Sequence, residues 1–186
     1  SALTASCRLV DATFTHLVQS LRPRLTEKQL ARQALTFFHH HQASPAFPPI
    51  IAVNSHSATP HHLSTATKIR SGDLVLIDIG CKFQGFCSDL TRVIWLGPPS
   101  PLHRLVYHLV AQAYAAAVAC LHAGVSSRTV DATARKVITA AGYGQYFIHG
   151  TGHSLGRRIH KLPKISPHAP SHVLRAGTAV TIEPGI

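Results

Sequence analysis

Three acidic side chains stand at or near the ends of apolar segments that are typical of buried strands. Asp78 lies in the segment 73–79, Asp89 follows eleven residues later, and Glu183 closes the segment 178–183. A carboxylate in an apolar strand is costly unless a cation or hydrogen bonds compensate its charge. A single Asp at a strand end is more often a turn former. The chain has only seven acidic residues against eighteen Lys and Arg, so three in such places favour a shared metal site.

A glycine-rich segment supplies histidines at close spacing. His149-Gly-Thr-Gly-His153 is followed by His160, so the three imidazoles are separated by four and seven residues. The glycines argue against a helix and allow the backbone to approach a site closely. Neutral imidazole is the commonest nitrogen ligand for transition metals. The chain has fifteen histidines, and most of the others are expected on the surface, among them His39, His40, His41, His168 and His172.

Helices and strands must bring these side chains together. Apolar residues at helical spacing predict a helix over 2–22, and a second helix is expected from Thr26 to His40. Thr26 and Gln29 have the spacing of a capping box, which marks the start of that second helix. Strands are then expected at 49–54, 73–79 and 83–96. Gly80 and Gly85 allow the chain to reverse, so a hairpin would return Asp89 to Asp78.

The same order of elements recurs after the linker Gly97-Pro98-Pro99. Two helices are expected first, followed by strand material, at 102–122, 127–141, 145–150, 156–162 and 178–183. Residues 70–80 and 175–185 share Arg, Gly, Val, Ile, an acid and Gly at the same spacings. The sequence therefore predicts an α+β domain of two duplicated halves, about 1–97 and 101–186, with pseudo-twofold symmetry. The duplication makes Asp78 and Glu183 equivalent.

Composition excludes several classes of protein. A chain of 186 residues is long enough for one sizeable domain, and no apolar run approaches the length of a membrane span. The net charge of +11 comes from scattered Lys and Arg with no basic run, so no nucleic-acid partner is expected. Four cysteines without a CxxC pair fit a reducing, cytoplasmic location. The absence of Met suggests a fragment or a processed product.

Five short segments together resemble the metal-binding signature of the pita-bread (M24-type) metallopeptidases. The family includes Xaa-Pro aminopeptidases, prolidases and methionine aminopeptidases, and the resemblance extends in order over essentially the whole chain. The segments are Asp78-Ile-Gly80, Ser88-Asp89-Leu-Thr-Arg92, His149-Gly-Thr-Gly-His153, Ile159-His160 and Thr181-Ile-Glu183-Pro-Gly185.

The resemblance implies a site for two divalent metal ions. Asp78 would bind one metal through both oxygens, Asp89 would bridge the two, and His153 with Glu183 would hold the other. A fifth ligand, an acid on a hairpin after the Glu183 strand, is expected beyond residue 186, so the last hairpin of the fold is expected to be missing. Mixed carboxylate and imidazole ligation favours Mn²⁺, with Co²⁺ and Zn²⁺ as alternatives.

The resemblance also implies a mechanism and a substrate. The metals would activate a shared water, and Glu183 would carry its proton to the leaving amine. His160 and His61 match histidines that contact the scissile amide and the tetrahedral intermediate; His61 is preferred to His62 because it directly follows a proline. His149 matches a histidine of the proline-specific branch. A peptide or dipeptide with proline in the second position is therefore the expected substrate.

One departure and several alternatives accompany this interpretation. Lys161 stands where the family usually has an acid after the histidine that matches His160, which puts an outer contact of the site in doubt. A methionine aminopeptidase is the alternative within the fold, and a non-catalytic pita-bread binding module is the alternative outside enzymes. Metal-free chemistry of the creatinase type is disfavoured, because the acids would then lack compensation. A homodimer is compatible with the sequence.

Overall fold

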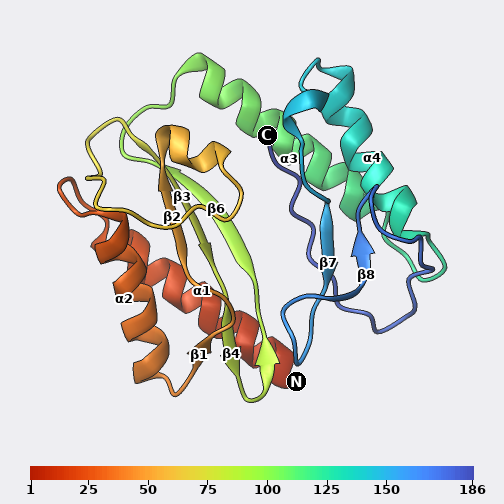
Figure 1. Ribbon diagram of the computed structural model, residues 1–186, viewed down its shortest axis with the longest axis horizontal. Coiled ribbons are helices and arrows are strands. Elements are labelled where there is room, and N and C mark those ends of the chain that lie inside the picture. The colour runs from red at the N-terminus through yellow and green to blue at the C-terminus, as the bar shows by residue number, and fades with distance from the viewer. The chain divides into compact units, whose positions relative to one another are not determined.

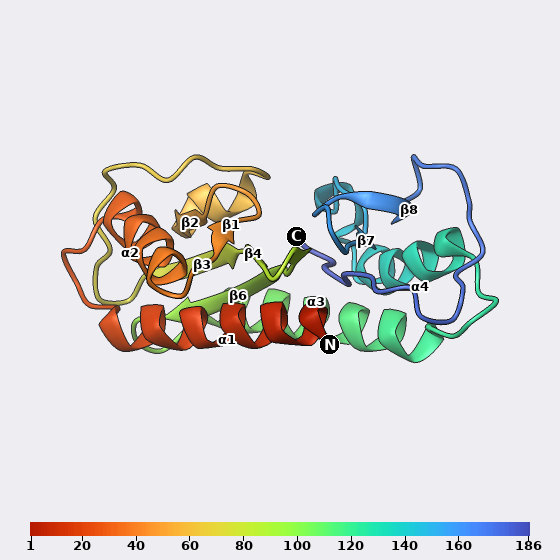
Figure 2. The ribbon, with the colours of Figure 1, turned by 90° about the horizontal axis from the view of Figure 1, so that it is seen from below.

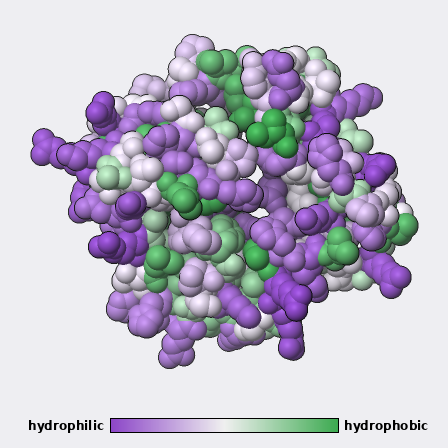
Figure 3. All heavy atoms as spheres, in the orientation of Figure 1, coloured by the Kyte–Doolittle hydropathy of each residue, from purple (hydrophilic) through white to green (hydrophobic).

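The computed structural model describes all 186 residues, which form two compact units. The first unit comprises Ser1–Pro99 together with Gly156–Ile159, and the second comprises Ser100–Leu155 together with His160–Ile186. Figure 1 shows the elements of each unit by label and colour. No helix combines the length and the apolar character needed to cross a membrane. Hydrophilic side chains cover much of the face seen in Figure 3.

Two helices begin the first unit, and each has a hydroxyl cap. Helix α1 spans Ala2–Ser20, with Ser1 as its N-cap, and helix α2 spans Glu27–His40. Thr26 accepts a hydrogen bond from the Gln29 amide while the Gln29 side chain accepts one from the Thr26 amide, so the predicted capping box is confirmed. Both helices bury an apolar face in the same core as the strands. Figure 2 shows α1 lying along the strands of this unit.

The strands of the first unit form two antiparallel sheets. One has the order β2-β3-β6 and the other the order β1-β4-β5. The core between helices and strands includes Leu17, Leu30, Phe38, Ile51 and Ile77, all fully buried. The strand bounds are β1 Ser44–Pro45, β2 Ile50–Val53, β3 Leu74–Ile79, β4 Cys81–Phe83, β5 Phe86–Cys87 and β6 Leu90–Trp95; a 3₁₀ helix, η1, spans Asn54–Ala58 after β2.

The second unit again begins with two capped helices. Helix α3 spans Pro101–Cys120 with Ser100 as its N-cap, and helix α4 spans Ser127–Ala140 with Ser126 as its N-cap. The 3₁₀ helix η2 (Gly144–Tyr146) and the strands β7 (Gly152–Ser154) and β8 (Lys161–Ile165) follow. Strands β7 and β8 pair antiparallel, and the buried core of this unit includes Val130, Ile138 and Ile165.

Backbone contacts at the start of the second helix recur in both units. The Glu27 amide donates to the Thr67 carbonyl, and the Ser127 amide donates to the His172 carbonyl. Isolated bridges join Thr26 to Lys68 in the first unit and Ser126 to Val173 in the second. Each extended segment that leads to a predicted metal ligand is therefore attached to the N-terminus of a helix in the same way, which supports the predicted duplication.

Three predicted strands differ from the structure. The range 83–96 is divided into short strands by the turn at Gln84 and Gly85, which both have positive φ. The range 145–150 begins in η2 and continues without strand structure, and the range 156–162 is a run of bends up to residue 160, after which β8 begins. The physical reason is the density of glycine and the anchoring of this backbone by side chains rather than by a neighbouring strand.

The segment 178–183 is extended but not a regular strand. Thr181 and Glu183 donate their amides to the carbonyls of His153 and Thr151, which places the segment beside β7. Two of the reverse bonds go to side chains, because the His153 amide donates to Thr181 Oγ1 and the Thr151 amide to Asp131 Oδ1, while the Leu155 amide donates to the Ala179 carbonyl. Only Val180 therefore forms a β-bridge, with Ser154.

Position 152 requires a glycine because the segment 178–183 approaches β7 closely there. A Cβ at position 152 would fall well inside van der Waals contact of the Thr181 carbonyl, which is backbone and cannot turn away. We expect Gly152→Ala to lower the free energy of unfolding by about 1–3 kcal/mol, the usual cost of overpacking. Urea denaturation measures the change, and Ser154→Ala in the same strand is the matched control. Equal stability of the two variants would contradict the close approach.

Candidate metal centre

In the first unit, the register of the sheet places Asp78 and Asp89 on one face. Asp78 lies in β3 and pairs with Thr91 of β6, and Asp89 is two residues before Thr91. Side chains two residues apart on an extended chain share a face, and diagonal neighbours of this kind lie within about 7–8 Å. Both carboxylates are half-buried. The hairpin expected from Gly80 and Gly85 therefore brings the two acids together.

In the second unit, the structure brings His153 and Glu183 into contact. His153 Nε2 lies 3.2 Å from Glu183 Oε1, and the side chains are 11% and 34% exposed. Thr181 donates its hydroxyl to the same Oε1 atom at 2.6 Å and accepts the His153 amide at 3.0 Å. Thr181 thus positions both groups, a role that its place in the motif Thr181-Ile-Glu183-Pro-Gly185 does not reveal.

Both ring nitrogens of His153 face hydrogen-bond acceptors. Nδ1 lies 3.2 Å from the Ser154 carbonyl, which can only accept, so Nδ1 carries a proton. The Glu183 carboxylate on the Nε2 side also only accepts when ionised. A neutral imidazole carries one N–H and satisfies one of these acceptors. The second contact calls for a cation, either a further proton or a metal ion, between His153 and Glu183.

Glu183 is held in its ionised form. Burial by itself would raise the pKa of this carboxyl group, but hydrogen bonds from His153 and Thr181 outweigh it, and the charges of His153 and His149 add to their effect. The pKa of Glu183 is therefore below its ordinary value of 4.5. An ionised carboxylate beside an imidazole nitrogen is the form that binds divalent cations.

Two further predicted residues lie in the same unit as His153. The His160 ring meets the His153 ring edge-on, with centroids 4.5 Å apart. His149 donates from Nδ1 to the Gly150 carbonyl at 2.8 Å and packs edge-on against Phe147, with centroids 5.1 Å apart. Nε2 of His149 lies 2.9 Å from where a Cβ of residue 185 would stand, so Gly185 makes room for the ring.

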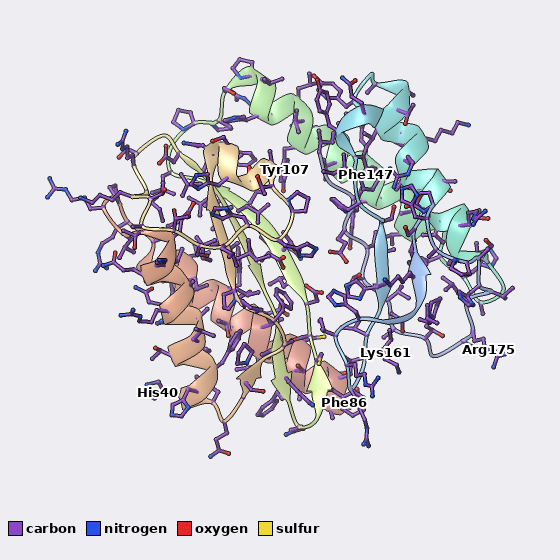
Figure 4. The ribbon with its side chains drawn as sticks, viewed as in Figure 1. His40, Phe86, Tyr107, Phe147, Lys161 and Arg175 are labelled. Atoms are coloured by element: carbon purple, nitrogen blue, oxygen red, sulfur yellow. The ribbon has the colours of Figure 1, made fainter.

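A buried ion pair anchors the backbone that carries these histidines. Arg135 binds both oxygens of Asp131, at 3.0 and 3.1 Å, and donates to the carbonyls of Phe147 and His149 at 2.7 and 2.8 Å. Its guanidinium also stacks on the Phe147 ring, 4.0 Å from the centroid; Figure 4 labels Phe147. Asp131 accepts the amide and hydroxyl of Thr151. The i, i+4 spacing of Asp131 and Arg135 on α4 is the feature of the sequence that could have indicated this ion pair.

Lysine should not be able to replace Arg135 without a loss of stability. A lysine has no planar fork, so it cannot bind both carboxylate oxygens and two carbonyls at once. We expect Arg135→Lys to lower the free energy of unfolding by about 1–3 kcal/mol, as buried acceptors lose their donors. Denaturant unfolding measures the loss. Lys136→Ala, at the exposed neighbouring position, is the control and should remain within about 0.5 kcal/mol of the parent.

The remaining residues singled out in the sequence are His61, His62 and Lys161. His61 is exposed with a φ of 57°, while His62 is turned inward and donates to Glu27 at 3.0 Å. Of the two, His61 is the imidazole that remains exposed. Lys161, labelled in Figure 4, begins β8 opposite Ser154 and is exposed. The catalytic and ligand roles of all these side chains stay predictions.

The donor atoms present fit a divalent cation. Two ligand atoms on one first-row metal stand about 3.0–3.4 Å apart when each bond is about 2.1 Å long. The 3.2 Å between His153 Nε2 and Glu183 Oε1 matches this separation. The hydrogen bond from His153 Nδ1 to the Ser154 carbonyl fixes the ring so that Nε2 is the nitrogen available to a metal. Asp78 and Asp89 supply a second pair of oxygen donors on the β3–β6 face.

Comparison with known proteins agrees with this chemistry. The model of metallopeptidase family M24 matches residues 1–186. The Xaa-Pro dipeptidase of Pyrococcus furiosus is 36% identical over 182 residues, which cover 97% of this chain and 52% of that protein. The chain thus spans about half the length of the relatives it matches.

Solved structures show the same fold. An Xaa-Pro dipeptidase from Bacillus anthracis superposes with a TM-score of 0.95 at 37% identity, covering all of this chain and 52% of that one. An X-Pro aminopeptidase from Thermotoga maritima gives a TM-score of 0.95 at 32% identity, covering all of this chain and 53% of that one. These similarities confirm the predicted α+β pita-bread fold. The chain belongs to metallopeptidase family M24.

Proposed function

We propose that this chain forms part of a metal-dependent exopeptidase that hydrolyses the peptide bond before proline, as an Xaa-Pro aminopeptidase or a prolidase-like dipeptidase. The contact between His153 and Glu183 carries the proposal, because its two acceptors around one imidazole call for a cation. The names of the relatives, Xaa-Pro dipeptidase and X-Pro aminopeptidase, supply the substrate class.

The proposal gives each side chain a role. Asp78, Asp89, His153 and Glu183 would hold two divalent cations, Mn²⁺ by preference, which when bound lower the pKa of a water molecule. Glu183 accepts the proton of the attacking water and returns it to the amine nitrogen as the C–N bond breaks. His160 and His61 donate hydrogen bonds to the amide and to the carbonyl oxygen, where negative charge develops.

His149 is proposed to select proline-containing substrates. Its ring is held in place by the Nδ1 bond to Gly150, by Phe147 and by the space over Gly185. We expect His149→Ala to lower kcat/KM for Xaa-Pro peptides by about 10–100-fold, as for the loss of one specificity contact. Steady-state assays on Ala-Pro and Ala-Pro-Ala test this, with His168→Asn as the exposed control. Unchanged kcat/KM would count against the proline-specific role.

The deciding experiment uses the full-length protein. Divalent metal content is measured after loading with Mn²⁺, and hydrolysis is followed for Ala-Pro, Ala-Pro-Ala and Met-Gly-Ala. Cleavage limited to the proline peptides supports the proposal. Cleavage of Met-Gly-Ala alone would identify a methionine aminopeptidase, and a protein that binds no metal and cleaves nothing would be a pita-bread binding module.

Several finer points stay predictions from the sequence. They are the single catalytic domain over 1–186, the homodimer and the cytoplasmic location. The choice of Mn²⁺ over Co²⁺ or Zn²⁺ is decided by comparing kcat/KM after loading with each ion.

A further inference from the structure

A second cluster of metal-ligand type lies wholly in the first unit, around Glu27. This residue begins α2, and its side chain is fully buried. Oε1 accepts from the Val53 amide at 2.9 Å and faces His56 Nδ1 at 2.7 Å. Oε2 accepts from the Thr65 amide and hydroxyl, both at 2.7 Å, and faces His62 Nε2 at 3.0 Å.

A cation beside Glu27 would compensate a buried negative charge. Burial raises the pKa of this carboxyl group, but hydrogen bonds from His62, His56 and Thr65 outweigh it and lower the pKa to about 2. Glu27 is therefore ionised at neutral pH. Its ion-pair partners are the imidazoles of His56 and His62, and no Lys or Arg side chain pairs with it. The other most deeply buried acid, Asp131, pairs with the permanent charge of Arg135 instead.

The geometry of the cluster suits a metal ion. One ligand atom each from Glu27, His56 and His62 lie within 4.8 Å of one another. The two imidazoles are stacked, with centroids 4.5 Å apart and planes 29° apart, so both present a nitrogen to the same carboxylate. Two histidines and one carboxylate are a donor set of zinc sites, in which a fourth position is left to water.

The surroundings of the cluster provide the outer contacts and the access that such a site needs. Bonds from Val53 and Thr65 would remain on the carboxylate after a metal replaced the two imidazole contacts, and ligating carboxylates are normally held by such bonds. The side chain of His56 is 34% exposed and that of His62 is 11% exposed, so the cluster borders solvent on the His56 side.

We propose that Glu27, His56 and His62 bind one divalent metal ion of the zinc type, at a site separate from the residues Asp78, Asp89, His153 and Glu183. His56 binds through Nδ1 with its proton on Nε2, and His62 binds through Nε2 with its proton on Nδ1. The ion joins three segments, the start of α2, the 3₁₀ helix η1 after β2 (Figure 1), and the loop 59–65. It thereby fixes the backbone next to His61. The site does not depend on the proposed peptidase activity.

The test is a Co²⁺ titration of a full-length variant that lacks the family ligands, Asp78→Asn with His153→Ala. Visible absorption reports four-coordinate Co²⁺, and calorimetry gives the stoichiometry. We expect one Co²⁺ per chain, displaced by Zn²⁺, and loss of the absorption when His56→Asn or His62→Asn is added. His168→Asn, an exposed histidine, is the control and should leave the titration unchanged.

Two outcomes of the Co²⁺ titration would overturn the proposal. One is the absence of Co²⁺ absorption in the Asp78→Asn, His153→Ala variant while circular dichroism shows a folded protein. The other is an absorption that persists in both His56→Asn and His62→Asn, which would assign the ion to other histidines. Histidine NMR that finds His56 or His62 protonated at neutral pH in the presence of excess Zn²⁺ would likewise show that a proton neutralises Glu27.

Discussion

Replacing Glu183 with Gln is expected to lower kcat/KM of the full-length protein by about 10²–10⁴-fold, the usual contribution of a general acid–base group. Gln keeps the size of the side chain, so the packing of the segment beside β7 is retained. It cannot take a proton from water, and its neutral oxygen is a weaker partner for His153 and for a cation. The Thr181 hydroxyl, now on Oε1 of Glu183 at 2.6 Å, cannot restore that charge.

The measurement is steady-state hydrolysis of Ala-Pro at saturating Mn²⁺, with bound metal determined on the same sample. Asp11→Asn is the matched control, because it removes one carboxylate from the exposed face of α1. It should leave kcat/KM unchanged. Activity of Glu183→Gln near that of the parent, with its metal retained, would remove Glu183 from the proton-transfer role.

Replacing Glu27 with Ala is expected to produce the largest loss of stability in the chain, about 3–5 kcal/mol, the usual cost of removing one partner of a buried charge cluster. The Val53 and Thr65 amides would lose the acceptor that the fully buried Glu27 side chain provides. His56 and His62 would lose the carboxylate that holds η1 and the loop 59–65 against α2. No rearrangement confined to a side chain can replace an acceptor that serves two backbone amides.

Urea unfolding of the parent, Glu27→Ala and Lys28→Ala measures this effect. Lys28 is the exposed neighbour on α2, and its replacement should change the free energy of unfolding by less than about 0.5 kcal/mol. An isosteric Glu27→Gln variant should fall between the two, because one acceptor oxygen remains. Similar stability of Glu27→Ala and Lys28→Ala would show that the cluster does not contribute to folding.

Local signals in the sequence predicted the helices and the duplication well. Thr26 with Gln29 marked the start of α2, and the capping box is present. The glycines at 80 and 85 predicted a reversal, and β3 pairs with β6 after it. These features depend on residues a few positions apart, so short-range sequence reasoning captures them.

The strands of the second half were predicted less well. The apolar range 145–150 suggested a strand, but Arg135 binds the Phe147 and His149 carbonyls and takes the place of a neighbouring strand. The segment 178–183 is extended as expected, yet Thr181 and Asp131 accept hydrogen bonds from amides that a regular ladder would send to carbonyls. A pattern of apolar residues does not show which side chains will compete for the backbone.

The sequence by itself determined the duplicated helices, the hairpin between Asp78 and Asp89, and the acids and histidines that match a metallopeptidase motif. Only the tertiary structure decided which acids are most deeply buried. Glu27 and Asp131, both on helices, are 0% and 1% exposed, whereas Glu183, which drew attention as a strand acid, is partly exposed. The partners of Glu27 in β2, η1 and the loop 59–65 lie 26 to 38 residues away in the chain, and the partner Thr151 of Asp131 lies 20 residues away. Burial and charge compensation depend on neighbours in space, and no spacing along the chain specifies them.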